Sequence, residues 1–385
     1  MMKKLSFPVF LLILWFVFWA TYTLGQYPMD WIEAGVNWFS GIVGSMMSEG
    51  WLKDLLTDGI IAGVGSVLVF LPNILILYFF ISVMEDSGYM ARAAVLMDGA
   101  MRKIGLQGRS FIPMVMGFGC NVPAIMAAGT IDNRKTRLVT MAVIPFMSCT
   151  GRLPVFVLLA GTFFPEHPVM ALFGIYLFGV IVAMLSAIVI GRFIKEDRAP
   201  RETELPPFRM PSWKVIFHNT WDQCKQYLEK ITTTILLFSI VMWFLGYFPI
   251  HQGATPAYQQ EHSYIGSIGK AIEPAMAPMD FSWKMDIGLL AGVGAKEFII
   301  STMGVTYSQD GTSLSQALQS DVSKPTALAF MVFVLLYFPC VATFAAIKNE
   351  TNSWKMAILL AIYTMVIAWL FAFAAYHIGL LLWPV

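Results

Sequence analysis

The sequence predicts an all-α polytopic membrane protein with about eight spans and one or two re-entrant or broken segments, arranged as two inverted-repeat halves. Three observations predict this fold class. Hydrophobic residues make up 57% of the 385 residues and charged residues only 13%, whereas a soluble domain carries about 25% charge. Apolar runs of roughly 20 residues, the length that crosses a bilayer, recur along the chain. Several of these runs are interrupted by proline, glycine or charge, which is typical of transporters and channels.

The composition also excludes several classes of function. The net charge is +1, so the chain lacks the basic excess with which proteins displace counterions from nucleic acid. No GxxxxGK[ST] phosphate loop is found, which argues against a nucleotide-hydrolysing enzyme. The four cysteines are widely spaced without a CxxC pair, which argues against a disulfide framework or a structural zinc site. We expect the lipid bilayer as a partner and no permanently bound cofactor.

The first region, residues 1–58, is predicted to hold one span followed by outer interfacial helices. Lys3 and Lys4 precede an apolar run over residues 7–24 that no clear small-residue cleavage site follows, so we interpret the run as a retained span. The positive-inside rule places the N-terminus in the cytoplasm. The stretch 27–57 is mixed in polarity and rich in tryptophan, which favours helices at the outer interface.

The next region, residues 59–194, is predicted to form a first gate half. Its run over residues 59–84 contains Pro72, which predicts a kink, and a cytoplasmic loop is expected after Asp86. The segment 111–128 has basic residues on both sides and a string of glycine and proline in its middle. It is therefore expected to enter and leave from the cytoplasm as a re-entrant hairpin. Two spans complete this half, over residues 138–164 and 169–194.

A charged, proline-rich stretch separates this half from the second. Residues 195–230 are predicted to form a cytoplasmic linker with an amphipathic helix, and residues 231–385 a second gate half. The apolar segments expected in the second half cover residues 231–248, 287–305, 326–347 and 357–383. Interrupted segments occur in both halves, near Cys120 and Cys149 and then at Cys340. Such a pairing indicates an inverted-repeat transporter whose site lies between the halves.

Three cysteines therefore lie at predicted helix breaks. A break leaves carbonyl oxygens without their helical partners, and a thiol beside them suits a borderline-soft cation, whereas Mg²⁺ or Ca²⁺ demands more carboxylates. Each cysteine taken alone is equally well a small buried hydrophobe, and each nearby methionine a flexible filler. The candidate pathway residues are Met116, Cys120, Asn121, Met147, Ser148, Cys149 and Cys340, and the candidate gate-forming residues are Gly117, Gly119, Pro123, Pro145 and Pro339.

Charged residues form a second set of candidates. Glu85 and Asp86 end a predicted span, where they either take up and release a cation or simply lie where charge is tolerated. Arg152 lies inside an apolar segment. Inserting an arginine at the centre of a membrane helix costs about 2.5–3.5 kcal/mol of free energy, so we expect Arg152 to neutralise a buried carboxylate or carbonyl groups. Lys296 and Glu297 are adjacent and do not face one another on a helix. Each is expected to find its own partner or to line a polar cavity.

The strings around these residues resemble the membrane gate domain of ferrous iron transport protein B. The resemblance is carried by Gly117–Ala124, Pro145–Cys149 and Pro339–Thr343, with further likeness at residues 85–92, 132–134 and 292–297. It implies an α-helical gate that carries Fe²⁺, as transported substrate, across the bacterial inner membrane into the cytoplasm. It also implies that the three gate cysteines lie near the ion path. Thr150-Gly151 stands where Ser-Ala is usual, a difference that we expect to be neutral.

The resemblance also implies partners. Members of that family normally begin with a cytoplasmic GTPase domain, which this sequence lacks. The chain is therefore expected to be either a separately encoded or truncated membrane part, or a protein that works without direct GTP control. A separate GTPase domain and a small SH3-like accessory protein of ferrous iron transport are the partners that the resemblance implies. A homo-oligomer stays open. Two other interpretations also stay open. In the first, the substrate is a nucleoside or another divalent metal, because the same gate fold resembles nucleoside carriers. In the second, the chain is a membrane anchor for a separate GTPase. Arg152, Lys296 and Glu297 argue against this, because charged residues inside a membrane cost free energy that a passive anchor has no reason to spend.

Overall fold

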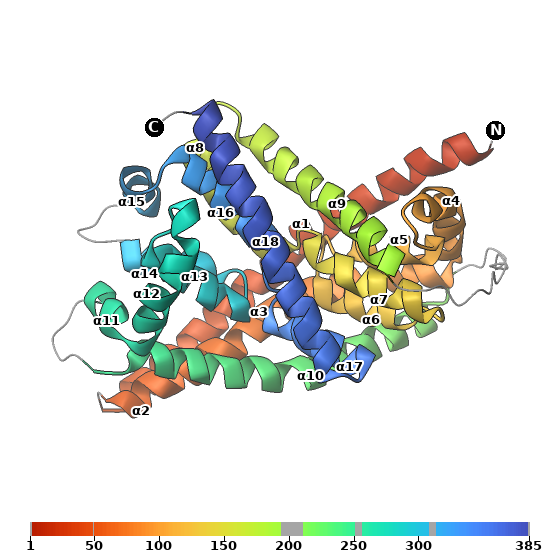
Figure 1. Cartoon of the computed structure of the whole chain (residues 1–385). Helices are drawn as coiled ribbons and strands as arrows, with labels where there is room; N and C mark the ends of the chain where they lie inside the picture. Colours follow the sequence, from red (N-terminus) through yellow and green to blue (C-terminus); the bar gives the residue numbers. More distant parts are fainter. Residues whose placement is uncertain (1, 49, 194–210, 251–255, 308–312, 384–385) are drawn as a thin grey trace. The chain divides into compact units, whose positions relative to one another are not determined.

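The computed structural model describes residues 2–48, 50–193, 211–250, 256–307 and 313–383, and in this part of the chain every regular element is helical (Figure 1). Residues 195–210 of the predicted linker lie outside the described residues. The chain divides into two compact units. The first comprises Met1–Ile144 with Met184–Ile240, and the second comprises Pro145–Ala183 with Val241–Val385.

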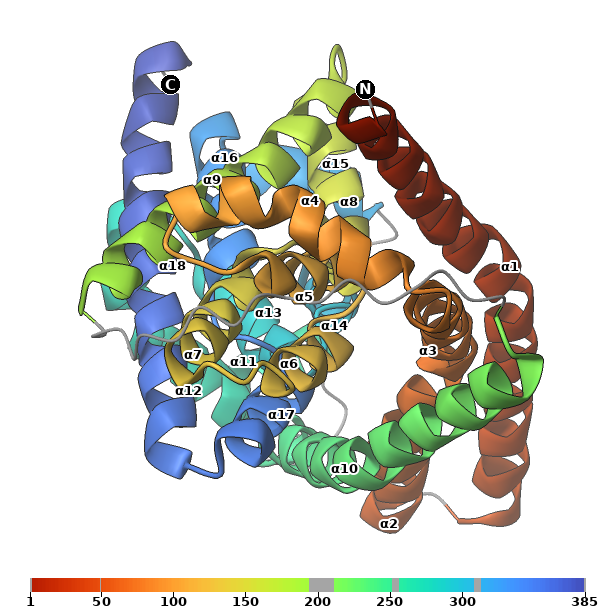
Figure 2. The same cartoon turned by 90° about the vertical axis from the view of Figure 1, so that its right-hand side faces the viewer.

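The first unit begins with a single long helix, α1 (Met2–Met46), where the sequence predicts a span and separate interfacial helices. Helix α3 (Ala62–Asp86) packs along α1, as Figures 1 and 2 show. The two helices approach closely at Gly25, because a Cβ atom at that position would overlap the side chain of Asn73. This packing explains why α1 continues through a stretch that looks irregular in sequence, since tertiary contacts override local propensity.

Helix α3 runs on through Pro72 and ends at a sharp bend, where the next helix, α4 (Tyr89–Lys103), departs at 82°. Gly88 lies at the bend with a φ of 74°, a conformation that glycine adopts without steric penalty. The expectation of a loop after Asp86 is therefore wrong for most of its length. The short elements before and after this pair are α2 (Trp51–Asp54), the π-helix η1 (Leu55–Ile61) and the 3₁₀ turn η2 (Gly108–Ser110).

The segment predicted as a re-entrant hairpin forms two short helices that pack on each other, α5 (Phe111–Met116) and α6 (Asn121–Gly129). Figure 2 shows both beside α7 (Arg134–Val143). A helix rises 1.5 Å per residue, so neither short helix reaches across a hydrocarbon core of about 30 Å. Figure 1 also shows the two helices that connect the units along the chain, α9 (Pro168–Phe193) and α10 (Trp213–Tyr247).

The second unit contains three interrupted helical segments. The 3₁₀ turns η3 (Ile144–Phe146) and η4 (Thr150–Arg152) lead into α8 (Leu153–Phe163). The segment predicted over residues 287–305 is two helices, α13 (Trp283–Gly294) and α14 (Phe298–Tyr307), with a break at residues 295–297 that the apolar pattern did not reveal. The segment over 326–347 is also divided, into α16 (Lys324–Leu336) and α17 (Val341–Thr351).

The remaining elements of this unit surround these segments. Helix α16 packs along the long α18, as Figure 1 shows, and α12 packs against α13. The bounds of these elements are α11 (Pro256–His262), α12 (Tyr264–Met276), the 3₁₀ turn η5 (Ala277–Met279), α15 (Leu314–Asp321) and α18 (Trp354–Leu382).

Four helical segments among the described residues are long and apolar enough to cross a membrane, and the bent pair Leu71–Asp86 and Tyr89–Lys103 is either a fifth, broken span or a re-entrant segment. The two that contain a break, Arg134–Phe163 and Lys324–Thr351, are 61% and 72% buried, whereas the unbroken Pro168–Arg192 and Trp354–Leu382 are each 33% buried. Irregular backbone is thus covered by protein, as a bilayer requires. The count of eight spans and the inverted repeat stay predictions.

Candidate ion-pathway site

The first break in the second unit is closed by a fully buried arginine. Helical hydrogen bonding stops after η3, and the chain resumes at η4 just before α8. Arg152, which is 0% exposed, donates from Nη1 to the carbonyl oxygens of Pro145 at 2.9 Å and Met147 at 3.2 Å. Those carbonyls have lost their helical donors, so the guanidinium supplies what the break removes.

The second break lies between α16 and α17, at Tyr337–Cys340, and a lysine from another segment reaches it. Lys296, which is 3% exposed, donates from Nζ to the carbonyl oxygen of Phe338 at 2.8 Å. The same nitrogen lies 3.4 Å from the centroid of the Tyr337 ring, a geometry that favours a cation over an aromatic face. The Tyr337 hydroxyl donates to the carbonyl oxygen of Leu289 at 3.3 Å, which fixes the ring.

Glu297, next to Lys296 in the chain, contacts the first break instead. A Cβ atom placed on Gly151 would overlap Oε1 of Glu297. The carboxylate is therefore in contact with the backbone of η4, one residue before Arg152. The turn between α13 and α14 thus places a positive group at one break and a negative group at the other.

Two free thiols accompany these charges. Cys149 and Cys340 are each partly accessible and unoxidised. Electrostatic interactions link Cys149 with Arg152, Cys340, Glu297 and Lys296. The Cys340 thiol also lies 3.1 Å from Oγ1 of Thr343 at the start of α17. Five predicted residues from three segments are therefore brought together inside the second unit.

The other predicted residues of the second unit support this cluster. Met147 and Ser148 are buried between η3 and η4, at 2% and 1% exposure. Pro145 accepts from Arg152 through its carbonyl group, and Pro339 occupies the break that ends at Cys340. Tyr337 was not predicted from the sequence, although its place directly before a Phe-Pro-Cys string was a signal.

The remaining predicted residues belong to the first unit. Cys120 is the extended residue that precedes α6, and Asn121 is 4% exposed with a side-chain oxygen that lacks a partner. Gly119 lies in the turn, where an added Cβ would come within 3.1 Å of Leu77. The turn and its flanks also contain Met116, Gly117 and Pro123.

The acidic pair at the end of α3 has a different environment. Asp86 accepts a hydrogen bond at 2.6 Å, through Oδ2, from the backbone nitrogen of Ser212. Glu85 is exposed. Both acids lie at the bend between α3 and α4, and Asp86 is already partly satisfied by the residues that lead into α10.

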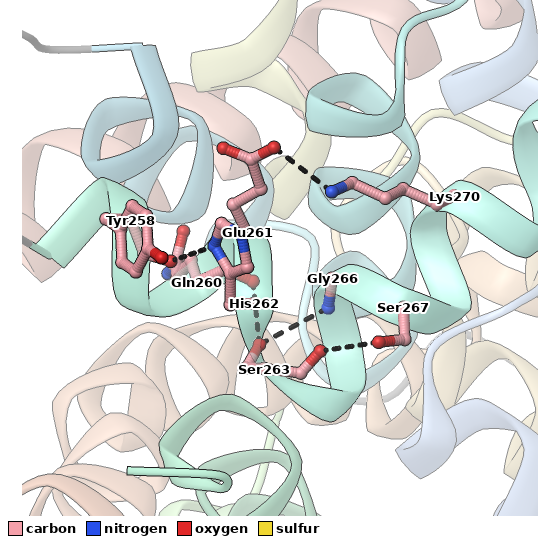
Figure 3. Close-up of polar contacts among 8 residues, drawn as sticks. All are labelled: Tyr258, Gln260, Glu261, His262, Ser263, Gly266, Ser267 and Lys270. Atoms are coloured by element: carbon pink, nitrogen blue, oxygen red, sulfur yellow. Dashed lines mark hydrogen bonds and ion pairs between the residues drawn. The ribbon is translucent and has the colours of Figure 1, made fainter. Parts of the chain in front are cut away.

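A polar corner at α11 and α12 lies elsewhere in the second unit (Figure 3). There the carboxylate of Glu261 pairs with the ammonium of Lys270 at 3.0 Å, and the rings of Tyr258 and His262 stack with centroids 4.1 Å apart. Ser263 caps α12 by accepting from the backbone nitrogen of Gly266. Across the described residues, no three His, Cys, Asp or Glu side chains are grouped as a metal site.

One buried acid was also missed by the sequence analysis. Asp286 near the start of α13 is 1% exposed, and neither carboxylate oxygen has a hydrogen-bond partner. The residue lies just before the segment predicted to enter the membrane. Burial, with the nearby Glu273 carboxylate, raises the pKa of Asp286 to about 7. An acid at the edge of an apolar run was the only signal in the sequence.

Comparison with protein families gives two matches. The family described as Gate, nucleoside recognition, matches residues 67–163 and 228–354. The family described as ferrous iron transport protein B C terminus matches residues 172–223. The first of these covers more than half of the chain and includes all of the helix breaks described above. No solved structure matches the chain.

Curated relatives align with nearly the whole chain. A Fe(2+) transport protein A/Fe(2+) transporter FeoB fusion protein of Porphyromonas gingivalis is 46% identical, over 98% of the chain and 50% of its own length. The Fe(2+) transporter FeoB of Campylobacter jejuni is 41% identical, over 99% of the chain and 64% of its own length. That of Staphylococcus aureus is 44% identical, over 98% and 58%. The chain thus spans about half to two thirds of the length of these relatives.

Proposed function

The chain belongs to the nucleoside-recognition Gate family and aligns with a membrane part of Fe(2+) transporters, and from this premise we propose that it conducts Fe²⁺ into the bacterial cytoplasm. The apolar helices make it a multi-pass membrane protein. One observation supports the proposal above all others. Two buried helix breaks in one unit each hold a free thiol, and a buried basic side chain donates to the backbone at each of them, Arg152 at the first and Lys296 at the second.

The proposed path uses Cys149 and Cys340 as transient ligands. A thiol that loses its proton to become a thiolate, next to backbone carbonyls, offers the mixed S and O ligands that a borderline-soft divalent ion accepts. Three or more strong ligands would trap the ion, whereas conduction requires sites that bind the ion weakly enough for it to leave. Two thiols at successive breaks fit that requirement better than a closed metal cage.

Selectivity in this proposal does not come from affinity. Sites with N, O and S ligands bind Cu²⁺ and Zn²⁺ more tightly than Fe²⁺. Selection for Fe²⁺ therefore rests on the weak, short-lived character of the thiol sites and on the metal that is available. Other divalent metals that reach the thiols are expected to compete with Fe²⁺ for passage.

The first unit contributes a third proposed ligand set. Cys120 and the side-chain oxygen of Asn121 stand at the turn between α5 and α6, and we propose them as further transient ligands for Fe²⁺. Glu85 and Asp86 are assigned to ion release, because the exposed carboxylate of Glu85 and the half-buried carboxylate of Asp86 would bind a hydrated cation only weakly. This places them on the cytoplasmic side, together with the N-terminus, in an inner-membrane protein.

Partners follow from the same proposal. One relative is named as a fusion of Fe(2+) transport protein A with a Fe(2+) transporter, which supports a small accessory protein of that kind as a partner. Control by a cytoplasmic GTPase domain and assembly into a homo-oligomer belong to the proposal as well.

The test is flux through the purified chain in lipid vesicles. Vesicles hold a metal-quenched dye, and Fe²⁺ is added outside under anaerobic, reducing conditions. We expect quenching by wild type, and a loss of about tenfold or more in Cys149→Ser and Cys340→Ser, because serine is a much poorer ligand for a borderline-soft ion. The matched control is Cys224→Ser, since Cys224 is a buried thiol inside the continuous helix α10 and does not belong to a helix break.

Two results would overturn the proposal. Unchanged quenching in the doubly substituted Cys149→Ser, Cys340→Ser protein would remove the thiols from the path. Uptake of labelled nucleosides without any metal-dependent quenching would assign the chain to the other substrate class that the Gate family description names.

A further inference from the structure

We propose that the ammonium of Lys296 is a built-in occupant of the second break, which Fe²⁺ must displace before it can bind beside Cys340. This inference rests on the proposed function, because it adds a gating residue to the same path. The ammonium nitrogen donates to the carbonyl oxygen of Phe338 at 2.8 Å, and it lies 3.4 Å from the centroid of the Tyr337 ring. Phe338 is only two residues before Cys340.

The ammonium takes the ligand that a metal ion at Cys340 would need. A helix break offers few carbonyl oxygens without a helical partner. At the second break, the carbonyl oxygen of Phe338 accepts a hydrogen bond from Lys296. A divalent ion and a buried ammonium repel each other strongly where water is excluded. The two cations therefore cannot share this break, and Fe²⁺ binding requires that Lys296 leave.

Comparison with Arg152 shows why Lys296 is suited to move. Arg152 contacts carbonyls five and seven residues away on its own segment, so it travels with the break that it closes. Lys296 reaches a carbonyl 42 residues away, from the turn between α13 and α14. A shift of that turn relative to α16 withdraws the ammonium and leaves the break intact.

The chemistry of the two cations points the same way. The guanidinium of Arg152 is planar and forms two hydrogen bonds with one nitrogen, which suits a permanent closure. The ammonium of Lys296 is a compact charge on a flexible four-carbon chain, and it donates to the carbonyl oxygen of Phe338. We assign Arg152 to holding its break in shape and Lys296 to gating the other.

The experiment removes the ammonium and then returns it as a soluble ion. In the vesicle assay, Lys296→Ala is expected to lower the half-saturating Fe²⁺ concentration by about tenfold or more, because a tethered group competes at an effective concentration in the millimolar range. Ethylammonium is expected to restore the competition in Lys296→Ala and to leave wild type unchanged. Tetramethylammonium, which has no N–H donor, should not restore it.

Thiol labelling provides a readout that does not depend on iron flux. With Cys120, Cys149 and Cys224 replaced by serine, the maleimide labelling rate of Cys340 is expected to rise when Lys296→Ala is added, and to fall again with ethylammonium. The matched control is Lys270→Ala, which removes an exposed lysine of the same unit that pairs with Glu261 at 3.0 Å (Figure 3). Labelling should be unchanged in that variant.

The outcomes separate the two proposals. Faster labelling with ethylammonium reversal, in a chain that carries no Fe²⁺, would keep Lys296 as the occupant of the second break and overturn the transport of Fe²⁺. Transport by wild type, with Lys296→Ala showing unchanged half-saturation, unchanged labelling and no response to ethylammonium, would overturn the gating role alone. If Lys296→Ala aggregates, Lys296→Met keeps the aliphatic bulk without the charge, and the same two measurements decide.

Discussion

Lys296 and Glu297 are consecutive residues whose side chains contact different helix breaks in the second unit. Lys296 donates to the carbonyl oxygen of Phe338 beside Cys340, and Glu297 lies against Gly151 beside Cys149. The two contacts are possible because both residues lie in the turn between α13 and α14, where the chain is not helical. A movement of this one turn would therefore change the charge at both breaks together.

The contact between Glu297 and Gly151 makes Gly151→Ala a probe of the first break. The added methyl group would overlap Oε1 of Glu297, so the carboxylate must shift from its place against the first break. Because only the end of a flexible side chain has to shift, we expect the free energy of unfolding to change by about 1 kcal/mol or less. Fe²⁺ flux in vesicles should fall several-fold, although the sequence alone suggests that the change is neutral.

The control for this prediction is Gly161→Ala in α8. A Cβ atom at Gly161 would meet nothing within 4 Å, and alanine is a better helix former than glycine by about 0.5–1 kcal/mol. Flux should equal that of wild type in this variant. Equal flux in Gly151→Ala as well would show that the position of the Glu297 carboxylate does not influence the path.

Arg152→Met is expected to destabilise the protein strongly. The substitution leaves the buried carbonyl oxygens of Pro145 and Met147 without their donor, at about 1–3 kcal/mol for each group. Arg152→Lys should recover part of the loss, because lysine keeps the charge but not the planar fork. Thermal unfolding in detergent measures the effect, and Arg102→Ala on exposed α4 is the control, since exposed ion pairs contribute little.

The bend between α3 and α4 offers a second stability prediction, in the first unit. Gly88 has a φ of 74°, so Gly88→Ala is expected to cost about 1–2 kcal/mol, the penalty for a left-handed residue with a Cβ atom. Gly99→Ala in the same helix should be neutral or stabilising, because nothing lies within 4 Å of its added Cβ. A Gly88→Ala variant as stable as wild type in chemical denaturation would contradict the strain argument.

The sequence predicts the places where the helices break better than it predicts their partners. The strings at Cys120, Cys149 and Cys340 contain proline or glycine, which are local signals, and the structure has a break at each of them. The break at Lys296 has no proline, and the surrounding run reads as one apolar span. Its partner, the carbonyl of Phe338, is 42 residues away, and no local pattern encodes such a contact.

The same distinction explains the errors outside the site. Helix α4 was predicted as a loop because its basic residues suggested a cytoplasmic connection, yet two of them, Arg102 and Lys103, lie in the last turn of a helix, where cations are favourable. Asp286 was overlooked because its burial depends on α12, which packs on α13 only in the folded chain.

Asp286 is expected to make stability depend on pH. Its pKa is about 7 in the folded protein and 3.8 as the ordinary value, so the folded chain holds a proton between these values that the unfolded chain has lost. Stability therefore falls as the pH rises from about 4 to about 7, and is constant above that range. The lysines of α12 and α13 are paired with other acids, Lys270 with Glu261 and Lys284 with Asp321.

Asp286→Asn should remove this dependence. The amide cannot ionise, so we expect the variant to melt at the same temperature as wild type near pH 4 and above it at pH 8. Each unit of pKa shift corresponds to about 1.36 kcal/mol, which sets an upper bound of a few kcal/mol on the gain at pH 8. Thermal unfolding in detergent across this pH range measures the slope, with Asp132→Asn, an exposed acid, as the control. If stability in Asp286→Asn still fell with pH at the wild-type slope, another buried group would be responsible, because the variant has no carboxyl group at residue 286 to titrate.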